Sequence, residues 1–533
     1  MKRLICLSVA ALIALAMVPI ALAEGGPMEK YDPAIEITSV KSLADGIQFE
    51  EGDSIDDNIW TRGYEADLGI KVSYLWAVPQ AEYLTKLNVA ISSDVLPDII
   101  PVPNLRIFKQ LVDTGVATDM TDILEQFGTP FTKQMIEDDN HVAFDQVTVD
   151  GRLMALPYIG GNVDGSAMLW IRKDWLDKLN LEPPATIDEM IAIAKAFKEQ
   201  DPDGNGEADT FGLVFDKALW GGFGTTIGFM EGFGAYYNGW VEKDGALAHG
   251  SIQPEMRAAL AKLAEMFADG LIDPEFSVKD SSKLAEMTTA GTAGILYGQH
   301  WIPFWPLQSC KDAFPESDWT PYPIPTVDGS PAQTMVGGSA ATIFVTNTHC
   351  ENPAATMKLY NYFFDKDCAL AGDTFDPEFH ADDTRKYNRY QYATVSTTYP
   401  LQNLFIHQGV MKYFNENDES MLQNYWVADN IEQNQKYESG DNTYWMTHAW
   451  SGPTSAFAVI DNYVKNGQLK LNGYIKADTE TMTELGSTLD TMRDEIFTKI
   501  IIGAEPIEAF NTFVDNWLKM GGEAITEEVN AAR

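Results

Sequence analysis

The chain has 533 residues, with 78 acidic and 37 basic side chains and a formal net charge of −41 at pH 7. Nucleic-acid binding needs stripes of Lys and Arg that neutralise phosphates, and none is found, so we expect no nucleic-acid partner. The length exceeds the ~250–300 residues at which single cores stop growing. The sequence therefore predicts more than one domain, with acidic residues that mostly keep the surface solvated.

Residues 1–23 have the pattern of a cleavable secretory signal peptide. Two basic residues precede an apolar run from Leu4 to Leu22, and small residues follow at Ala21 and Ala23. The alternative is a single membrane anchor, but an acidic residue follows the run where a stop-transfer signal would be basic. We expect a mature protein in the periplasm or at the cell exterior, without a lipid anchor because no cysteine follows the cleavage site.

Cysteine usage is low. Of the four cysteines, Cys6 lies inside the signal segment, which leaves Cys310, Cys350 and Cys368 in the mature chain. An odd number allows one disulfide at most and leaves at least one thiol over. The mature chain must therefore be stabilised by its own cores, and the sequence leaves open whether any disulfide forms.

Strand-like runs alternate with capped helices along the mature chain. The runs rich in β-branched residues are 70–74, 98–102 and 341–345. Caps and helical spacing predict helices after the Thr186/Glu189 capping box, from Pro254 to Gly270, from Asn352-Pro353, and from Pro506 to a stop at Gly521-Gly522. This alternation predicts an α/β fold packed as two lobes.

An acidic loop follows the first of these helices. Oxygen-bearing side chains recur at every second position around a glycine, at Asp201, Asp203, Asn205 and Asp209, and the backbone carbonyl of Glu207 can supply a further ligand. Ca²⁺ takes six to eight oxygen ligands, so this spacing predicts a structural calcium site that pins the loop. The twelfth position is a glycine, Gly212, so the bidentate glutamate of an EF-hand is absent. The alternative is a polar turn that binds nothing.

Residues 291–305 are a strand-like run that opens into glycine, histidine and tryptophan. Indole faces can stack on a sugar ring while polar groups bind its hydroxyls, so we expect His300, Trp301 and Trp305 to contact a ligand. The alternative is that these tryptophans are core. The chain has thirteen tryptophans, and the further candidates for the ligand site are Trp76, Trp220 and Trp450.

Sequence signatures of enzymes are missing. HExxH, G-x-S-x-G and P-loop patterns are absent, and the seven histidines lack metal-ligand spacing. We therefore expect a binding protein and no catalytic residues. A carboxylate pair for glycoside hydrolysis needs proximity only in space, so a secreted glycoside hydrolase or lyase stays open as the alternative.

Several segments, in order, resemble the sugar-binding family of extracellular solute-binding proteins of ABC importers (family 1), which includes maltodextrin- and oligosaccharide-binding proteins. The matching segments are DVLPDII (94–100), DGRLMALP (150–157), LWIRKDWLDKL (169–179), PATIDEM (184–190), YPIP (322–325) and the closing IIG (501–503) with GGEAITEEVN (521–530). The calcium-like loop and the tryptophan segment lie in the family's order among them, so the resemblance covers nearly the whole mature chain.

The resemblance implies a two-lobed, type II periplasmic-binding-protein-like fold with a ligand cleft between the lobes. It implies an N-terminal lobe from residues 31–162 plus about 336–400 and a C-terminal lobe from 163–335 plus about 401–533, with crossings near 160–166 and 328–338. By the same resemblance, Trp301 stacks on sugar and Asn104 supplies a polar contact. The segment 101–103 departs from relatives that carry aromatic or acidic groups there.

The function implied by the resemblance is capture of an oligosaccharide, cleft closure and delivery to the permease subunits of an ABC transporter. We expect a monomer in solution. Because the chain is so acidic, we expect neutral glycans rather than uronate-rich ones, although local charge in the cleft can reverse this preference. A binder of peptides or of another solute is the alternative within the same class.

Overall fold

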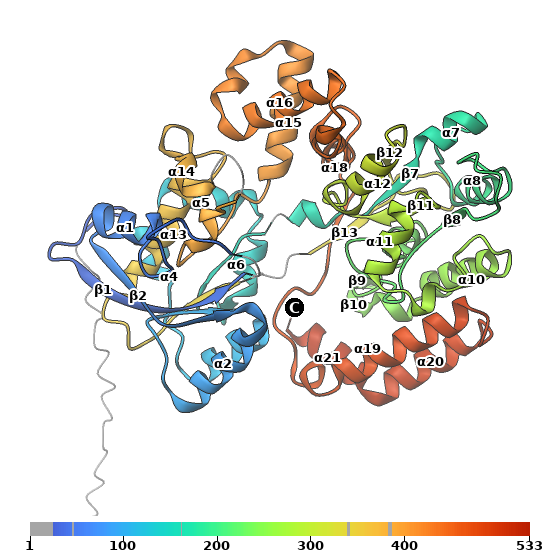
Figure 1. The fold of residues 1–533 in the computed structure, drawn as a ribbon. Coiled ribbons are helices and arrows are strands. Elements are labelled where there is room, and N and C mark those ends of the chain that lie inside the picture. The colour runs from blue at the N-terminus through green and yellow to red at the C-terminus, as the bar shows by residue number, and fades with distance from the viewer. Residues whose placement is uncertain (1–24, 45–46, 161, 338–341, 382–385, 533) are drawn as a thin grey trace, which may run out of the picture.

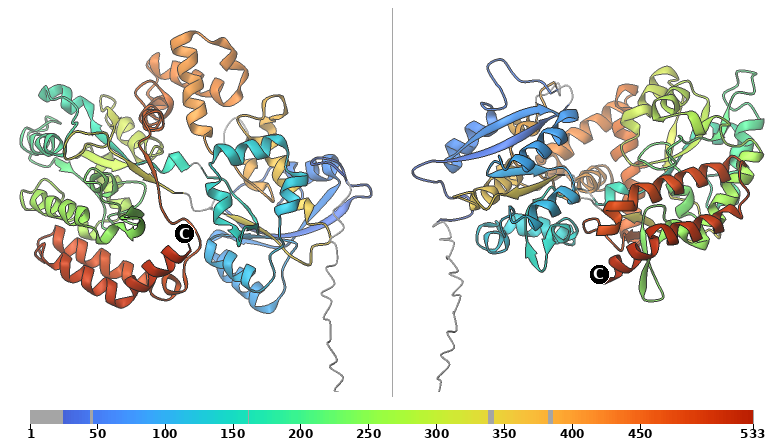
Figure 2. Two further views of the ribbon diagram at one scale, coloured as in Figure 1. Left: turned by 180° about the vertical axis from the view of Figure 1, so that it is seen from behind. Right: turned by 90° about the horizontal axis from the view of Figure 1, so that it is seen from below.

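The computed structural model describes residues 25–532 except 45–46, 161, 338–341 and 382–385. The predicted signal peptide at 1–23 lies outside the described residues. Two lobes stand side by side (Figure 1), and the views from behind and from below show the same division (Figure 2). Each lobe is built on its own mixed sheet. The predicted two-lobed α/β fold is confirmed.

The N-terminal lobe contains a five-stranded sheet in the order β2-β1-β3-β14-β6. Its strands are β1 (Ile35–Leu43), β2 (Ile70–Pro79), β3 (Ile99–Val102), β14 (Ile343–Thr346) and β6 (Leu156–Pro157). β1 is parallel to β2 and β3, whereas β14 is antiparallel to β3 and β6. A short hairpin joins β4 (Thr148–Val149) and β5 (Arg152–Leu153).

The helices of this lobe come from two stretches of the chain. They are α1 (Ile59–Gly63), α2 (Gln80–Ser93), α3 (Leu105–Asp113), α4 (Thr121–Phe127), α5 (Pro130–Asp138), α6 (Val142–Gln146), α13 (Ala354–Asp367) and α14 (Pro377–His380). The second stretch packs into the same apolar core as the first, which is why the lobe is discontinuous in sequence.

The C-terminal lobe contains a four-stranded sheet in the order β12-β7-β11-β8. Its strands are β12 (Trp319–Tyr322), β7 (Met168–Arg172), β11 (Ala293–Gly298) and β8 (Phe211–Leu213). β7 is antiparallel to both β11 and β12, and β11 is parallel to β8. Two smaller pairs join β9 (Trp240–Lys243) to β10 (Ala246–His249), and β13 (Thr334–Val336) to β15 (Leu469–Leu471).

Helices surround this second sheet. They are α7 (Lys173–Leu179), α8 (Ile187–Glu199), α9 (Ile227–Glu231), α10 (Pro254–Ala268), α11 (Ser281–Thr289), α12 (Gln308–Ala313), α19 (Glu480–Ile501), α20 (Ala509–Trp517) and α21 (Glu523–Ala531). A further group, α15 (Gln402–Glu416), α16 (Tyr425–Glu438), α17 (Trp445–Ser451) and α18 (Ala456–Lys465), lies above the junction of the lobes (Figure 1).

Core membership shows where the chain passes from one lobe to the other. Ile159 belongs to the N-terminal core and Val163 to a C-terminal one. The chain returns to the N-terminal core between Ala332 and Ile343. A third change occurs between Tyr399 and Leu404. Where two lobes are joined by such crossing segments, a hinge motion would occur about them.

The predicted elements are mostly where the sequence placed them. The Thr186/Glu189 capping box is formed at the start of α8, and α10 and α13 occupy the predicted segments. The predicted stop at Gly521-Gly522 is confirmed: Gly521, with φ of 132°, has a non-helical backbone, and a separate helix, α21, begins at Glu523. The glycines break the hydrogen-bond ladder, but Ile525 and Val529 still bury an apolar face, so a helix resumes.

The fold also shows the state of the three thiols and the character of the helices. Cys310, Cys350 and Cys368 are all buried and free, so they form no disulfide. Among the helices of the described residues, none combines the length and the apolar composition that a bilayer span requires.

A buried carboxyl group anchors the second crossing. Glu231, at the end of α9, accepts a 2.8 Å hydrogen bond at Oε1 from the backbone N–H of Met335 in β13. Burial raises the pKa of Glu231 from 4.5 to about 8. The folded protein therefore holds a proton here that the unfolded chain releases above its own lower pKa.

We expect Glu231→Gln to remove part of the pH dependence of stability. The proton on Glu231 stabilises the fold fully below pH 4.5, and this contribution is lost as the pH rises to about 8. Glutamine imitates the protonated form, so at pH 8 the variant should be the more stable by roughly 1–4 kcal/mol, with equal stability near pH 4. Denaturant unfolding across this range measures the difference, and parallel pH profiles of the two proteins would contradict it.

Candidate functional site

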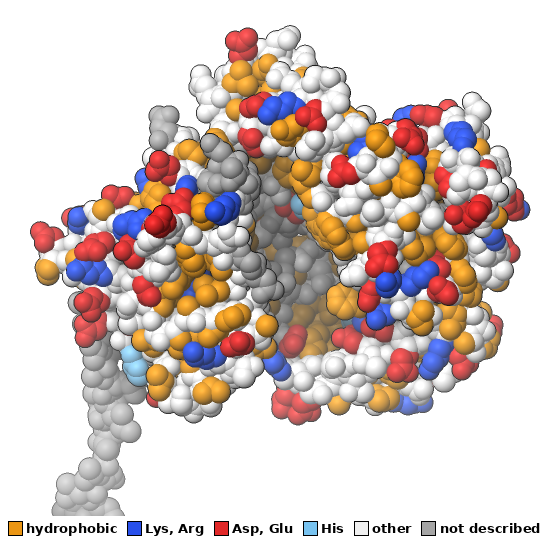
Figure 3. All heavy atoms as spheres, in the orientation of Figure 1, with side chains coloured by type: hydrophobic (Ala, Val, Ile, Leu, Met, Phe, Trp, Pro, Cys, Tyr) orange, Lys and Arg blue, Asp and Glu red, His pale blue; other side chains and the backbone are white. Residues whose placement is uncertain are grey.

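The surface between the lobes is deeply hollowed, and hydrophobic side chains gather on the wall that belongs to the C-terminal lobe (Figure 3). In open α/β sheets, ligands bind in the crevice outside the carboxyl ends of the strands. We therefore expect a ligand to lie beside the segments that follow β11 in one lobe and β1 and β6 in the other. We take the hollow as the candidate ligand site.

An aromatic wall is formed by two loops, one after β8 and one after β11. The tryptophans Trp220 and Trp305 and the ring of Phe304 expose 48%, 43% and 44% of their surface. Trp305 packs edge-on against Phe223 at 5.4 Å, which holds its indole out from the surface. Large exposed rings are thus concentrated in two neighbouring loops, and a concentration of this kind is a common feature of interaction surfaces. We call Trp220, Trp301, Phe304 and Trp305 the aromatic wall.

Gln299 places the aromatic wall beside the first crossing. Its side-chain amide donates to the backbone oxygen of Gly165 at 3.2 Å, and Gly165 closes the short helix of the crossing, η2 (Asn162–Gly165). The Oε1 atom of Gln299 accepts the indole N–H of Trp301 at 2.9 Å. Trp301 also lies against Gly222, where a Cβ atom would come within 2.6 Å of its ring. Trp301 is therefore connected to the first crossing through the side chain of Gln299.

His300 and Trp450 lie behind this wall. Trp450 is buried and its indole N–H donates to Nδ1 of His300 at 2.9 Å, so the His300 proton is on Nε2. Burial lowers the pKa of His300 to about 4, which keeps the ring neutral. Phe457 packs on both rings, at 5.0 and 5.1 Å. The structure thus places Trp450 in the core. His300 is partly buried and lies nearer the surface.

Two predicted N-terminal contacts have structural roles. Asn104 is the N-cap of α3, where its Oδ1 accepts the backbone N–H of Ile107 at 3.0 Å. Trp76, in β2, packs against Tyr83 at 5.4 Å and carries the Lys86 ammonium 5.1 Å above its ring. Neither side chain lines the polar cavity that the N-terminal lobe places beside the crossings.

That polar cavity, of about 320 Å³, lies at the carboxyl ends of β1 and β6. Its wall includes Lys41 from β1, Tyr158 just after β6, and Gln402 from the start of α15. The neighbour of Gln402, Asn403, donates to Asp164 in the first crossing at 2.8 Å, so the cavity adjoins the hinge. Sequence reasoning missed these residues because they are separated by hundreds of positions and belong to no local motif.

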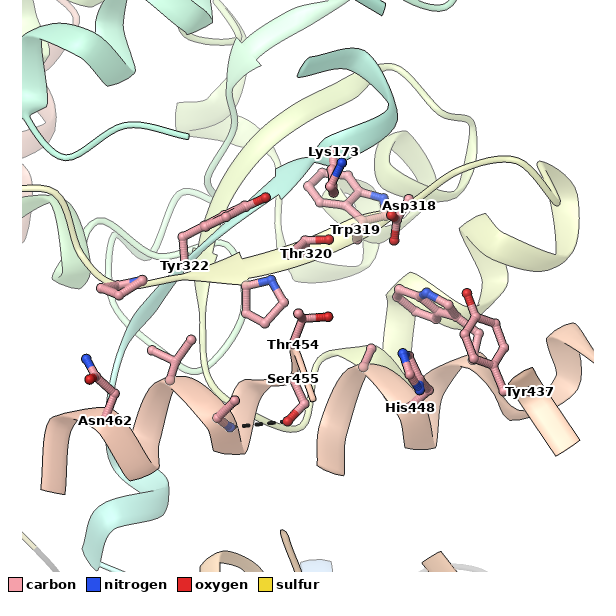
Figure 4. A pocket seen from close by; sticks show the side chains of 16 residues that line it. Lys173, Asp318, Trp319, Thr320, Tyr322, Tyr437, His448, Thr454, Ser455 and Asn462 are labelled. Carbon is pink, nitrogen blue, oxygen red and sulfur yellow. Dashed lines mark hydrogen bonds between the residues drawn. The ribbon is translucent and has the colours of Figure 1, made fainter. Parts of the chain in front are cut away.

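A second cavity, of about 470 Å³, lies between β12 and the helices α17 and α18 (Figure 4). Its wall combines Trp319, Tyr322, Tyr437 and His448 with the carboxylate of Asp318. Every residue in the wall belongs to the C-terminal lobe and its helices. Movement of the other lobe would not close this cavity, so it does not fit a site that works by closure between lobes.

The acidic loop turns at Gly204 and Gly206, which both have positive φ. The Asn205 amide donates to carboxylates on both sides, to Asp203 at 2.9 Å and to Asp209 at 3.2 Å. Asp201 accepts three backbone N–H groups of the loop. Among the described residues, neither this loop nor any other part of the chain brings three or more His, Cys, Asp or Glu side chains close enough together to hold a metal.

This loop nevertheless suits a cation chemically. The carboxylates of Asp203 and Asp209 converge on one polar hydrogen donor, and hard oxygen ligands are those that Ca²⁺ prefers. The exposed side chain of Glu207 takes no part in these hydrogen bonds, and its backbone N–H donates to Asn205. Asp201, Asp203, Asn205 and Asp209 are the residues that would hold the ion.

Comparison with known proteins gives a family match and a fold match. Residues 46–367 match the family described as bacterial extracellular solute-binding protein. The polygalacturonan/rhamnogalacturonan-binding protein YtcQ of Bacillus subtilis (strain 168) is 30% identical over 223 residues, which is 42% of this chain and 43% of that protein. The alignment thus spans less than half of the relative's length.

Solved structures share the fold. The alginate-binding protein AlgQ2, in a crystal structure without calcium ion, has a TM-score of 0.60 at 17% identity and covers 95% of this chain and 99% of its own. The ABC-transporter substrate-binding protein FusA of S. pneumoniae, as an EF-hand mutant in complex with fructo-nystose, has a TM-score of 0.56 at 15% identity, with 93% and 98% covered. At these identities the likeness concerns the fold alone.

Proposed function

The chain belongs to the bacterial extracellular solute-binding proteins, and from this premise we propose that it captures an oligosaccharide in the hollow between its lobes. The observation that carries the proposal is the aromatic wall, whose exposed rings stand beside the first crossing. Trp220, Trp301, Trp305 and His300 are the proposed contacts on this side. Relatives described as polygalacturonan-binding and as a complex with fructo-nystose support a carbohydrate ligand.

Binding would close the hinge. A ligand shifts a two-state equilibrium only by its greater affinity for one state, so the sugar must touch both lobes when they are closed. We propose that the lobes comprise residues 31–162 with about 336–400 and residues 163–335 with about 401–533, a division supported by the separate apolar cores. The closed monomer would then deliver its sugar to the permease subunits of an ABC transporter.

A thermal-shift screen with a glycan panel tests this function. Ligand at ~100 times Kd adds roughly 2.7 kcal/mol of apparent stability, which raises the melting temperature measurably. Peptides and other solutes in the same screen test the alternative ligands. If peptides raise the melting temperature and no glycan does, the carbohydrate proposal is wrong.

We further propose that the protein binds its sugar without transforming it. The family consists of solute-binding proteins, and this supports a role without catalysis. Incubation of the bound oligosaccharide followed by chromatography tests the point. Release of shorter or unsaturated sugars would identify a hydrolase or lyase instead.

The proposed location is outside the cytoplasmic membrane, reached through a cleaved signal peptide. The extracellular family supports the location, and the segment 1–23 supports the route. Without a cysteine after the cleavage site, the mature protein would carry no lipid anchor. Fractionation of the native host and mass spectrometry of the mature N-terminus measure both features.

We propose that Ca²⁺ stabilises the acidic loop. Removing calcium with EGTA should lower the melting temperature, because the loop carboxylates would lose the cation that balances their mutual repulsion. The double variant Asp203→Asn/Asp209→Asn should melt at one temperature with or without calcium. As a matched control, Asp113→Asn in the other lobe should keep the response. A wild-type melting curve unaffected by EGTA would rule out the site.

A further inference from the structure

The polar cavity of the N-terminal lobe contains a cation, Lys41, that has no counter-ion within the described part of the chain. Lys41 lies in the wall, and it forms no ion pair among the described residues. The carboxylate of Asp367 is the acidic group in this wall, and it is engaged by Nδ1 of His380 at 2.7 Å. Among the described residues, the ammonium of Lys41 therefore has no negative partner in its own cavity.

The hydrogen bonding of Lys41 also leaves room for an anion at its ammonium group. Its Nζ donates to the backbone oxygen of Ala393, which uses one of the three N–H groups of an ammonium. Burial lowers the pKa of Lys41 to about 8, so at pH 7 most molecules still carry the charge. Burying a charge without a partner costs free energy, and an anion bound beside Nζ offsets that cost.

The remaining wall suits a sugar ring. Tyr158 and Tyr390 supply aromatic surface, and Tyr390 stacks on His380 at 5.2 Å with the rings 15° apart. Gln391 and Gln402 supply amide groups that can bind ring hydroxyls. A volume of about 320 Å³ is at the lower end of the range for small-ligand pockets, which suits one sugar unit of a longer chain.

We propose that this cavity is the subsite for a sugar that carries a carboxylate, a uronate, and that the ammonium of Lys41 pairs with that carboxylate. The inference rests on the proposed function and gives it a ligand class. It opposes the expectation of a neutral glycan that the net charge suggested. Surface charges more than ~8–10 Å away are screened by salt, whereas a partly buried lysine acts at contact distance.

Calorimetric titration with trigalacturonate and with trimannuronate tests the subsite, each as the free acid and as its methyl ester. The wild-type protein should bind at least one free acid at least tenfold more tightly than the corresponding ester. Lys41→Met should lower the affinity for that acid about tenfold, to the level of the ester, and leave the affinity for the ester unchanged. Lys41→Arg should restore part of the preference, because it keeps the charge.

Lys71→Met, in the neighbouring strand β2, is the matched control. Lys71 is an exposed lysine that faces Glu65 at 3.4 Å, so its loss should change neither affinity. Equal binding of acid and ester by the wild-type protein overturns the uronate subsite and leaves oligosaccharide binding standing. Loss of acid and ester affinity alike in Lys41→Met overturns the pairing with the carboxylate. If the wild-type protein binds no glycan of any kind, the proposed function fails together with the subsite.

Discussion

Replacing Trp305 by alanine is expected to weaken oligosaccharide binding by about 10- to 100-fold while the protein stays folded. The ring is 43% exposed and stands beside Phe223, so its removal opens no cavity in the core. Loss of an aromatic anchor in a binding site costs ~1–3 kcal/mol, and each 1.4 kcal/mol is a factor of ten in Kd. Isothermal titration with the best glycan of the thermal-shift screen measures the change.

Two variants make the result interpretable. Trp305→Phe keeps an aromatic face and should retain most of the affinity. Phe314→Ala removes an exposed ring from the opposite end of the same lobe, beside the acidic loop, and should leave binding unchanged. Equal affinity in Trp305→Ala and wild type would mean that this ring does not contact the sugar.

Gly222→Ala is expected to reduce binding as strongly, although it adds only a methyl group. The new Cβ would lie 2.6 Å from the Trp301 ring and 2.7 Å from Oε1 of Gln299, closer than atoms can approach. Trp301 and Gln299 must both shift away from the new methyl group, which disturbs the 2.9 Å hydrogen bond between them. Overpacking of this kind costs ~1–3 kcal/mol. We therefore expect a lower melting temperature and an affinity about tenfold or more below that of wild type.

The control for this variant is Gly486→Ala in α19. A Cβ at Gly486 meets no atom within 4 Å, and alanine is the better helix former, so the variant should be slightly more stable and bind normally. A crystal structure of the Gly222→Ala protein would show the displaced indole directly. An unmoved indole with wild-type affinity would mean that the backbone around Gly222 adapts without cost.

Local patterns accounted for the elements, because the forces that start a helix or a strand act over a few residues. The Thr186/Glu189 capping box and the run from Pro254 carried their own signals, and α8 and α10 begin there. The stop at Gly521 also carried a local signal, whereas the helix that follows it, α21, depends on the burial of its apolar face. Burial depends on what packs against the helix, and the sequence of the helix itself does not specify those neighbours.

The candidate site was only half predictable for the same reason. Trp301 and Trp305 stood in one short glycine-rich segment, and the aromatic wall contains both. The sequence made Trp450 an equally good candidate, yet the fold buries it, and its indole N–H donates to His300. Composition cannot distinguish an exposed ring from a core ring, because the difference lies in the neighbours that tertiary packing supplies.

By itself, the sequence determined the α/β class, the order of elements and the acidic loop, all of which depend on residues close together in the chain. The tertiary structure alone decided which distant residues share a cavity. Lys41, Tyr158 and Gln402 meet because the chain crosses between lobes and returns. The charge of the whole chain suggested a neutral ligand, whereas Lys41, which has no ion pair among the residues that the structure describes, favours an acidic one. Contact distance and burial decide the strength of an electrostatic interaction, and folding sets both.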